Sequence, residues 1–307
     1  MSRPTSRGRS CTRQAGSSRV RGRKERGLEL KEVIGRRRSI RFFEPWREVE
    51  REKIQAILEA IYRAPRVLEV DFIRIVVVQR DRLTAEQMAQ LKTPTTTAQL
   101  DMAPVYVFFF ADIDALEEAA LTGGGFRQLV EARVLNRSHG WTPEFVADTA
   151  AGYLKSLLDD PDRVPMGPPG PGGKPRLASR EALRLARTAI GIAQDHALLA
   201  AFNEGLGALL SAVSVPAAKA VMGIPDSWVP SSPMLLGYPG ETPEAGGQRP
   251  REPFEEDFFE LRYGHPFYRE PAVVEQLKAA RMIQEEAPFP WRMDEVRGLA
   301  RKYGLPD

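Results

Sequence analysis

A short run of basic residues near the front of the chain carries the strongest chemical signal in the sequence. Arg37, Arg38, Ser39 and Arg41 place three guanidinium groups and a hydroxyl on one short segment. Guanidinium groups bind phosphate through paired, charge-assisted hydrogen bonds, and a partly buried dianion needs several such donors. The segment is therefore a candidate phosphate site. The alternative is a solvated basic helix end, because cations are favourable at a helix C-terminus.

Most other catalytic signatures are missing from the sequence. It contains no GxSxG nucleophile elbow, no P-loop, no HExxH and no GxGxxG after a predicted strand. The glycine triplet 123–125 lacks the Lys-Ser or Lys-Thr that would follow in a P-loop and indicates a plain loop. The only cysteine, Cys11, excludes an internal disulfide framework. The three histidines, His139, His196 and His265, are too widely spaced to suggest a metal site, and we expect no metal.

Composition and charge indicate a globular protein with a basic tail. The chain has 307 residues, of which 42% are hydrophobic and 28% charged, and a net charge of +3. Residues 1–26 hold eight Arg and one Lys against one Glu, so the rest of the chain is mildly acidic. We expect this tail to be disordered. It is either a solvated extension or an arm for an anionic surface, and the acidic remainder argues against nucleic-acid binding as the main function.

No stretch approaches the roughly 18 apolar residues of a membrane helix, and we expect a cytoplasmic protein because one cysteine is typical of a reducing compartment. Hydrophobic periodicity then predicts the elements that position the basic cluster. Helices are expected around 28–34, over 49–61 and 85–91, and over Arg180–Asn203; strands are expected over 72–78, 105–111 and 234–236. Helices and strands alternate without a strict repeat, which favours an α+β fold or a three-layer sandwich.

Several short segments, in order, resemble the nitroreductase-like FMN-dependent oxidoreductases. They are the run RRSIRFF at 37–43, before a helix that ends at Ala64-Pro65; the helix end and GLG at 189–207; the GIP at 223–225; the GYPG at 237–240; and RPREPFEE at 249–256. The resemblance extends over residues 34–256 and leaves 112–185 and about the last 40 residues unexplained.

The resemblance implies a three-layer α/β/α sandwich with a mostly antiparallel central sheet and an inserted helical lid. It also implies a homodimer with FMN in clefts at the subunit interface. NADH or NADPH would reduce the flavin, which would pass the hydride to a small organic acceptor such as a nitroaromatic or a quinone. We divide the chain into the tail (1–26), the FMN-binding domain (27–263, with the insert at 112–178) and a C-terminal extension (264–307).

By position, the resemblance assigns the phosphate or ribityl chain to the front arginines and Ser39, with Arg249 and Arg251 reaching the same phosphate. It assigns the flavin N5 edge to the backbone near Ser211 and Ala212. The implied cofactor-binding set is Arg37, Arg38, Ser39, Arg41, Pro65, Arg66, Glu69, Ser211, Ala212, Arg249 and Arg251. We assign no catalytic side chain, because the flavin supplies the redox chemistry. Water, Tyr153 or His139 would protonate the product.

The segment after Ala64-Pro65 departs from the family. Arg66, Glu69 and Asp71 stand where the family commonly has Ser, Asn and Gln. An ionised carboxylate only accepts hydrogen bonds, whereas an amide also donates. If Glu69 or Asp71 lies beside N1 and C2=O, its charge opposes the reduced anionic flavin and lowers the reduction potential. Alternatively, both carboxylates pair with Arg66 or Arg74 and the flavin is held mainly by its phosphate.

Two further regions have predicted roles. The insert, with Trp141, Phe145, Tyr153 and the Pro-Gly run at 165–173, is a candidate lid that selects the acceptor, or else a surface elaboration. The extension contains two short amphipathic helices, and we expect it to wrap on the partner subunit or to close one edge of the core. Alternative functions are dehalogenation, flavin breakdown or ene reduction on the same fold, or a flavin-storing or flavin-less binding protein.

Overall fold

The computed structural model describes residues 28–66, 70–122, 128–129, 131–134, 144, 160–166, 176–287 and 292–305. The basic tail, Glu69 and most of the insert, including His139, Trp141, Phe145 and Tyr153, lie outside these ranges. The predicted lid and the predicted disorder of the tail therefore stay predictions. In the described part of the chain, no helix is both long enough and apolar enough to cross a membrane.

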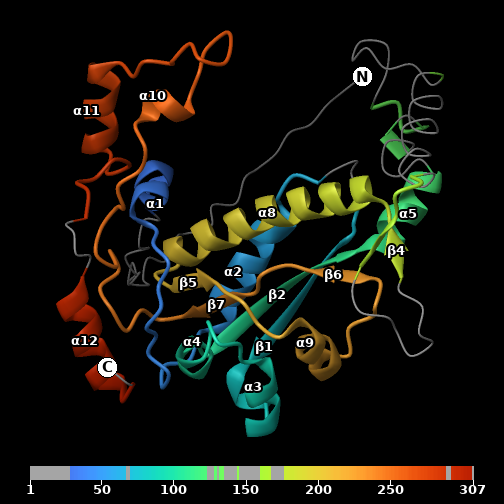
Figure 1. Cartoon of the computed structure of the whole chain (residues 1–307), viewed down its shortest axis with the longest axis horizontal. Coiled ribbons are helices and arrows are strands. Elements are labelled where there is room, and N and C mark those ends of the chain that lie inside the picture. The colour runs from blue at the N-terminus through green and yellow to red at the C-terminus, as the bar shows by residue number, and fades with distance from the viewer. Residues whose placement is uncertain are drawn as a thin grey trace, which may run out of the picture.

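A five-stranded sheet forms the centre of the molecule (Figure 1). Its strands run in the order β1 (Ile73–Gln79), β2 (Val105–Asp112), β7 (Met234–Gly237) and β5 (Gly207–Leu210), and β6 (Trp228–Pro230) also pairs with β2. Every pairing in this sheet is antiparallel. The mostly antiparallel sheet predicted from the sequence is confirmed.

Strand β2 is buried on both faces, so its alternating side chains build two separate cores. Val105, Val107 and Phe109 pack with helices α2 (Arg51–Tyr62) and α8 (Arg180–Asn203). On the opposite face, the even-numbered aromatic residues of β2 pack with α3 (Ala85–Leu91), α4 (Ala98–Met102) and α9 (Val215–Met222). Each large apolar side chain contributes roughly 1.5–3 kcal/mol on full burial. Helices on both faces confirm the three-layer α/β/α sandwich.

Tyr106 is the one polar side chain of β2 that enters the second core. Its hydroxyl donates to the carbonyl of Leu100 at 2.5 Å, which satisfies a donor that would be costly to bury alone. Burial raises the pKa of Tyr106 above its ordinary value, so the hydroxyl keeps its proton.

Helix α8 has the predicted bounds, because local signals mark both of its ends. The Ser179 hydroxyl accepts from the backbone of Ala182 at the N-terminus, and Gly205 follows the C-terminus with a positive φ of 75°. One face of the helix, with Ala189, Ala193 and Ala197, is fully buried. The second half of α8 is apolar nearly all round, which predicts burial on several sides in a core or at a subunit interface. In this chain, Leu198, Leu199 and Ala200 are only half-buried. This second face remains open to a neighbour.

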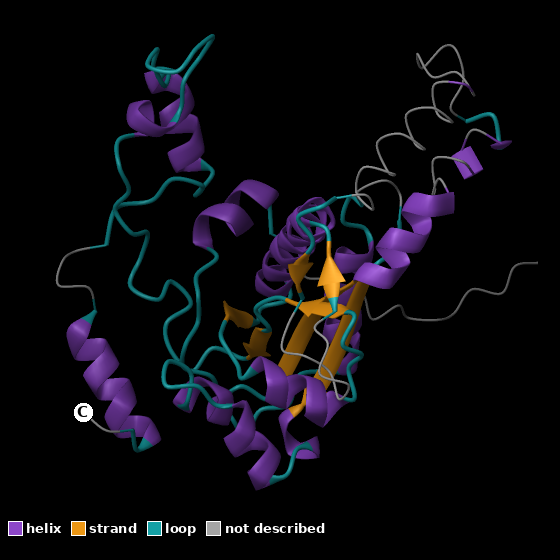
Figure 2. Cartoon of the chain, turned by 45° about the vertical axis from the view of Figure 1, so that its right-hand side comes forward, coloured by secondary structure: helices purple, strands orange, loops and turns teal. Residues whose placement is uncertain are grey.

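The remaining elements lie around this sandwich. They are α1 (Leu30–Arg36), the 3-10 turn η2 (Arg80–Arg82), α5 (Ile113–Thr122), the two-stranded sheet of β3 (Val164–Pro165) and β4 (Leu177–Ala178), and the C-terminal helices α10 (Phe254–Asp257), α11 (Pro271–Ala279) and α12 (Met293–Tyr303). Figure 1 shows α10 and α11 away from the sheet and α12 lower on the same side. Figure 2 shows the same helices in a view that is turned about the vertical axis.

Candidate functional site

The basic segment predicted from the sequence lies along the free edge of β5. Ser39 pairs in parallel with Ala208, and the Ile40 N–H donates to the Ala208 carbonyl at 3.1 Å. A Cβ on Gly207 would come within 2.8 Å of the Ile40 side chain, which explains why glycine stands there. The basic segment therefore adds a short stretch of backbone to the edge of the sheet. This pairing positions the backbone of Arg41, which follows Ile40.

At this edge, two arginines of the front segment each lie near an arginine of the late segment, Arg37 near Arg251 and Arg41 near Arg249. Burial lowers the pKa of Arg37, and the charge of Arg251 lowers it further, while Asp195 opposes the shift. Burial also lowers the pKa of Arg41, followed by the charge of Arg249. Each front arginine thus lies close enough to a late arginine to be repelled by it. The structure brings together the two segments that sequence analysis assigned to one phosphate.

This cluster has an excess of positive charge. Arg41 donates to the Ser39 carbonyl at 3.1 Å. Within the described residues, no carboxylate forms an ion pair with Arg37, Arg41 or Arg251. Arg37 and Arg41 are half-buried, whereas Arg249 and Arg251 are exposed. Guanidinium groups that repel one another are stabilised by an anion with several acceptor oxygens. A phosphate dianion has this chemistry, so the residues present fit the phosphate end of FMN.

Arg38 differs from its neighbours in the number of hydrogen bonds that it makes to the protein, and its assignment to the cofactor stays a prediction. Its guanidinium donates to the carbonyls of Gly247 at 2.9 Å, Gly35 at 2.7 Å and Arg37 at 2.8 Å, and to Gln284 Oε1 at 3.2 Å. Protein acceptors thus take most of its donors. Arg38 ties the end of α1 to the late segment.

Gln248 strengthens the same connection immediately before Arg249. Its side-chain amide donates to the carbonyls of Gly35 at 3.0 Å and Met282 at 2.9 Å, and its Oε1 accepts from the Gln284 N–H at 3.0 Å. A polar side chain that satisfies three partners across the chain holds its backbone in one place. The distance between the two arginine segments is set by this contact, which sequence reasoning did not find.

Ser211 and Ala212 follow the other end of β5, about 10 Å and about 13 Å of extended chain from Ala208, where Ser39 pairs. The Ser211 N–H donates to the Pro233 carbonyl at 2.9 Å, and its hydroxyl lies 3.0 Å from that of buried Thr96. Ala212 is exposed. One short strand therefore connects the arginine cluster to the predicted flavin-edge residues, and Thr96 is an additional contact that positions Ser211.

Pro65 and Arg66 lie elsewhere in the chain. Arg66 forms an ion pair with Asp71 and lies over the Tyr62 ring at 5.0 Å, while Arg74 pairs with Asp112 at 3.1 Å. The Asp71 part of the second alternative, a pair with Arg66, is therefore observed, and the rest of that alternative stays a prediction. Glu69 lies outside the described residues. Arg66 lines a cavity of about 300 Å³ with residues of α2 and β1, namely Gln55, Leu58, Glu59, Ile61, Tyr62, Ile73 and Ile75.

The sheet register shows that this corner is distant from the arginine cluster. Ile73, beside Arg66, pairs with Ala111 at one end of β2, whereas Ala208 pairs through Leu236 with Val105 at the other end. The separation is about 20 Å along β2 and about 14 Å across three strand spacings. The predicted site residues of one chain therefore form two groups at opposite corners of the sheet.

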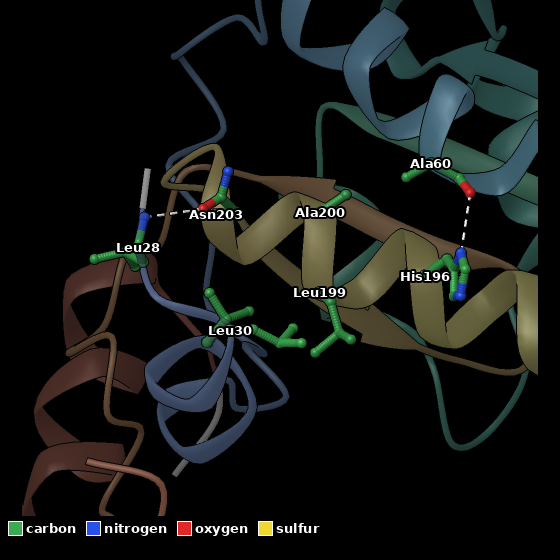
Figure 3. Close-up of a pocket in the computed structure, with 8 residues that line it drawn as sticks. Leu28, Leu30, Ala60, His196, Leu199, Ala200 and Asn203 are labelled. Carbon is green, nitrogen blue, oxygen red and sulfur yellow. Dashed lines mark hydrogen bonds between the residues drawn. The ribbon is translucent and has the colours of Figure 1, made fainter. Parts of the chain in front are cut away.

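An apolar groove of about 360 Å³ lies on the open face of α8 (Figure 3). Leu28, Leu30, Leu199 and Ala200 line it, together with Val33, Ala60, His196 and Asn203. Leu30 is 63% exposed, and the Leu28 N–H donates to Asn203 Oδ1 at 3.1 Å. His196 Nδ1 lies 3.2 Å from the Ala60 carbonyl, so this histidine links α8 to α2.

Metal ligands do not form a comparable cluster. Over the ranges that the structure describes, no three His, Cys, Asp or Glu side chains gather where they could hold a metal ion. The site is therefore defined by its arginines, by β5 and by the residues after β5.

Comparison with known proteins agrees with this arrangement. The Nitroreductase family model matches residues 34–136. A candidate NAD(P)H:FMN oxidoreductase from Staphylococcus epidermidis is 16% identical, with a TM-score of 0.55 over 78% of this chain and 99% of its own. The candidate nitroreductase YdfN of Bacillus subtilis is 15% identical, with a TM-score of 0.50 over 79% and 94%.

A third solved structure is CLA-ER, an enone reductase of gut-bacterial fatty acid saturation, which is 20% identical with a TM-score of 0.50 over 76% of this chain and 98% of its own. A search of curated protein sequences gave no match. The resemblance predicted from the sequence motifs is confirmed: the chain has the nitroreductase fold, and the family model covers the basic segment, α2, β1 and β2.

Proposed function

We propose that this protein is an FMN-dependent oxidoreductase of the nitroreductase type, which takes a hydride from NADH or NADPH and passes it to a small organic acceptor. The observation that carries the proposal is the meeting of Arg37 and Arg41 with Arg249 and Arg251 at the edge of β5. The family match and the fold support an oxidoreductase. The single cysteine, Cys11, fits a reducing compartment such as the cytoplasm.

The chain's own residues bind and orient the cofactor. The four arginines would hold the phosphate, and Ser39, whose backbone pairs with β5, would present its hydroxyl beside them. Backbone at Ser211 and Ala212 would approach the ring edge, with Thr96 holding the Ser211 hydroxyl at 3.0 Å. When bound, FMN supplies the hydride-transfer chemistry, and the protein supplies position and electrostatics.

We further propose a homodimer, and the separation of the two groups of site residues supports it. One chain keeps Pro65 and Arg66 at the corner of the sheet opposite its arginine cluster. A second copy would bring its own Pro65 corner to the cluster of the first. The apolar groove on α8, with exposed Leu28 and Leu30 beside it, offers a surface for that copy.

The first test of this proposal is the absorbance of the purified full-length protein. We expect flavin bands that bleach when NADH or NADPH is added without oxygen, and that return when a quinone or nitroaromatic acceptor follows. Bands without bleaching would favour the flavin-storing alternative. A protein that neither carries FMN nor binds added FMN would overturn the assignment.

A paired substitution tests whether the arginine cluster is the phosphate site. Arg41→Gln with Arg249→Gln should weaken FMN binding by at least about a hundredfold, because each charge-assisted hydrogen bond contributes roughly 1.5–3 kcal/mol. Arg47→Gln is the matched control, since Arg47 is an exposed arginine that pairs with Glu44 at 3.4 Å. Equal FMN affinity in the double variant and the control would place the phosphate elsewhere.

A further inference from the structure

Behind the arginine cluster lies a buried carboxylate that the proposed function does not use. Glu241 follows the Gly-Tyr-Pro-Gly run, and its side chain is fully buried. One oxygen, Oε1, accepts from the backbone N–H groups of Arg41 and Phe42, the latter at 3.0 Å. The other oxygen, Oε2, pairs with Arg292, whose side chain is 4% exposed. A buried ionised group needs such complete pairing to be tolerated.

Helix α12 contacts the same backbone at both of its ends. Arg292 immediately precedes the helix and pairs with Glu241, and Thr242 donates to Glu295 at 3.0 Å. At the other end, the Tyr303 ring stacks on Phe42 at 6.1 Å between ring centroids. The Tyr303 hydroxyl donates to the Gly240 carbonyl at 3.4 Å. The helix thus holds the backbone from which the Arg41 side chain extends.

The direction of these contacts matters for an anion site. Glu241 binds the backbone N–H of Arg41, while the Arg41 guanidinium donates to the Ser39 carbonyl. Arg292 occupies the second carboxylate oxygen. If Arg292 were absent, Glu241 would gain by turning to the Arg41 guanidinium, and it would then compete with a phosphate for the same donors.

We propose that Glu241 is a positioning residue for the phosphate site, and that Arg292 and α12 keep its carboxylate on the backbone of residues 41–42 and off the Arg41 guanidinium. This inference rests on the proposed function. It assigns the end of the C-terminal extension a role in cofactor affinity, although none of its residues is proposed to touch the cofactor.

Comparing two flavins separates a positioning role from a general structural one. Riboflavin has the ring and ribityl chain of FMN without the phosphate, so only FMN binding should depend on Glu241. In the full-length chain, Glu241→Gln should weaken FMN binding by about tenfold, which corresponds to about 1.4 kcal/mol, and should leave riboflavin binding unchanged. Glu117→Gln is the matched control, because Glu117 pairs with Arg163 at 2.5 Å outside this cluster.

Hydrogen exchange on the unaltered protein gives a second measurement that requires no variant. Coupling between two sites is reciprocal, so phosphate binding at Arg41 must stabilise the docking of α12. Amides of residues 293–303 should exchange at least about threefold more slowly with saturating FMN than with saturating riboflavin. This measurement decides the question if Glu241→Gln does not fold.

The outcomes distinguish this inference from the proposed function. If the unaltered protein does not prefer FMN to riboflavin, the phosphate site itself is wrong. If it prefers FMN, but Glu241→Gln keeps that preference or loses both flavins equally, the positioning role is wrong and the phosphate site stands. Equal exchange of α12 with the two flavins would also overturn the positioning role.

Discussion

The C-terminal part of the chain from α10 to α12 has a projecting half, the region of α10 and α11, and a packed half, α12, and the two differ in how they use their apolar residues. Helix α12 buries Leu299 and Ala300 and stacks Tyr303 on Phe42 and Trp46. The region of α10 and α11 projects from the body, and α11 has no buried residue (Figures 1 and 2). Helix α12 therefore packs on residues next to the basic segment. For the projecting half, the prediction of a partner subunit stands.

Composition does not explain this difference, because the projecting half is also rich in large apolar side chains. Leu261 is 97% exposed and Tyr263 is 89% exposed. Phe254 and Phe258 stack on each other at 4.2 Å between ring centroids, but they do not reach the core. Contiguous exposed apolar surface of this kind marks an interface. The packed half therefore serves its own chain, and we infer that the projecting half serves a second copy.

The largest expected effect comes from breaking the packed half at its buried ion pair. Arg292→Met breaks a buried ion pair and leaves Glu241 Oε2 without its guanidinium partner, which should cost about 3–5 kcal/mol of unfolding free energy. Arg163→Met removes a partly exposed partner of Glu117 and should cost about 1 kcal/mol or less. Urea unfolding of both variants measures the difference. Similar losses would mean that α12 contributes little to holding the fold.

The projecting half should instead affect assembly. Leu261→Ser with Tyr263→Ser should leave the unfolding free energy of the monomer within about 0.5 kcal/mol, because both side chains are exposed. It should raise the dimer dissociation constant by at least about a hundredfold, or nearly 3 kcal/mol. Sedimentation velocity over a concentration series measures this shift.

Leu177→Ser in β4 is the control for this variant, since Leu177 is an exposed apolar residue outside the extension. It should dimerise like the unaltered protein. If the Leu261 and Tyr263 variant also dimerises as tightly as the unaltered protein, the projecting half does not form the interface.

Gly35 in α1 tests the contact of this helix with residues 281–282, which lie between α11 and α12 in the chain. A Cβ on Gly35 would come within 2.1 Å of the Arg281 carbonyl oxygen and 2.5 Å of Met282 Cα. Gly35→Ala should therefore cost about 2 kcal/mol, because backbone must move. Gly191→Ala in α8 meets nothing within 4 Å and should stabilise the protein by about 0.5–1 kcal/mol. Equal effects in thermal unfolding would show that residues 281–282 do not pack on α1.

Local sequence signals were enough for much of the fold. The β-branched and aromatic runs at 72–78 and 105–111 correspond to β1 and β2, and the predicted bounds of α8 match because its cap residues are local. Strands β5 and β6 have only four and three residues. Strand β5 pairs with β7 and with the backbone at Ile40, and β6 pairs with β2. These partners are far away in the sequence, so no short segment predicts the pairing.

The candidate site shows the same limit. The sequence pointed to the basic segment, and the structure brings its Arg37 and Arg41 to the late arginines. The sequence did not show that Arg38 makes different hydrogen bonds from Arg37 and Arg41. One of the carbonyls that accept from Arg38 belongs to Gly247, which is far away in the sequence. Glu241 carried one signal, a carboxylate directly after the Gly-Tyr-Pro-Gly run. Its partners are backbone groups and Arg292, so only tertiary structure assigns them.

The smallest expected effect is a pH dependence at the contact of α1 with Glu244 and Arg281. Glu244 accepts from Arg36 at 2.9 Å, and this hydrogen bond, aided by the charge of Arg281, lowers the pKa of Glu244 below its ordinary 4.5. A carboxylate with a depressed folded pKa stabilises the protein above its unfolded pKa and loses that contribution as the pH falls through the folded value. The pair is partly exposed, so the contribution should be below about 1 kcal/mol.

Glu244→Gln should therefore be slightly less stable than the unaltered protein at pH 7, and the difference should shrink as the pH falls below about 4.5. Urea midpoints measured from pH 7 to pH 3 follow it. Glu50→Gln is the comparison, because the pKa of Glu50 is also lowered, by backbone and Tyr238 hydrogen bonds away from the extension. When both substitutions are repeated in an Arg281→Gln background, the stability change caused by Glu244→Gln should become smaller, because the charge of Arg281 helps to lower the pKa of Glu244. The stability change caused by Glu50→Gln should stay the same. If the Glu244→Gln difference is the same with and without Arg281→Gln, residues 281–282 pack on α1 by shape alone, without an electrostatic contribution.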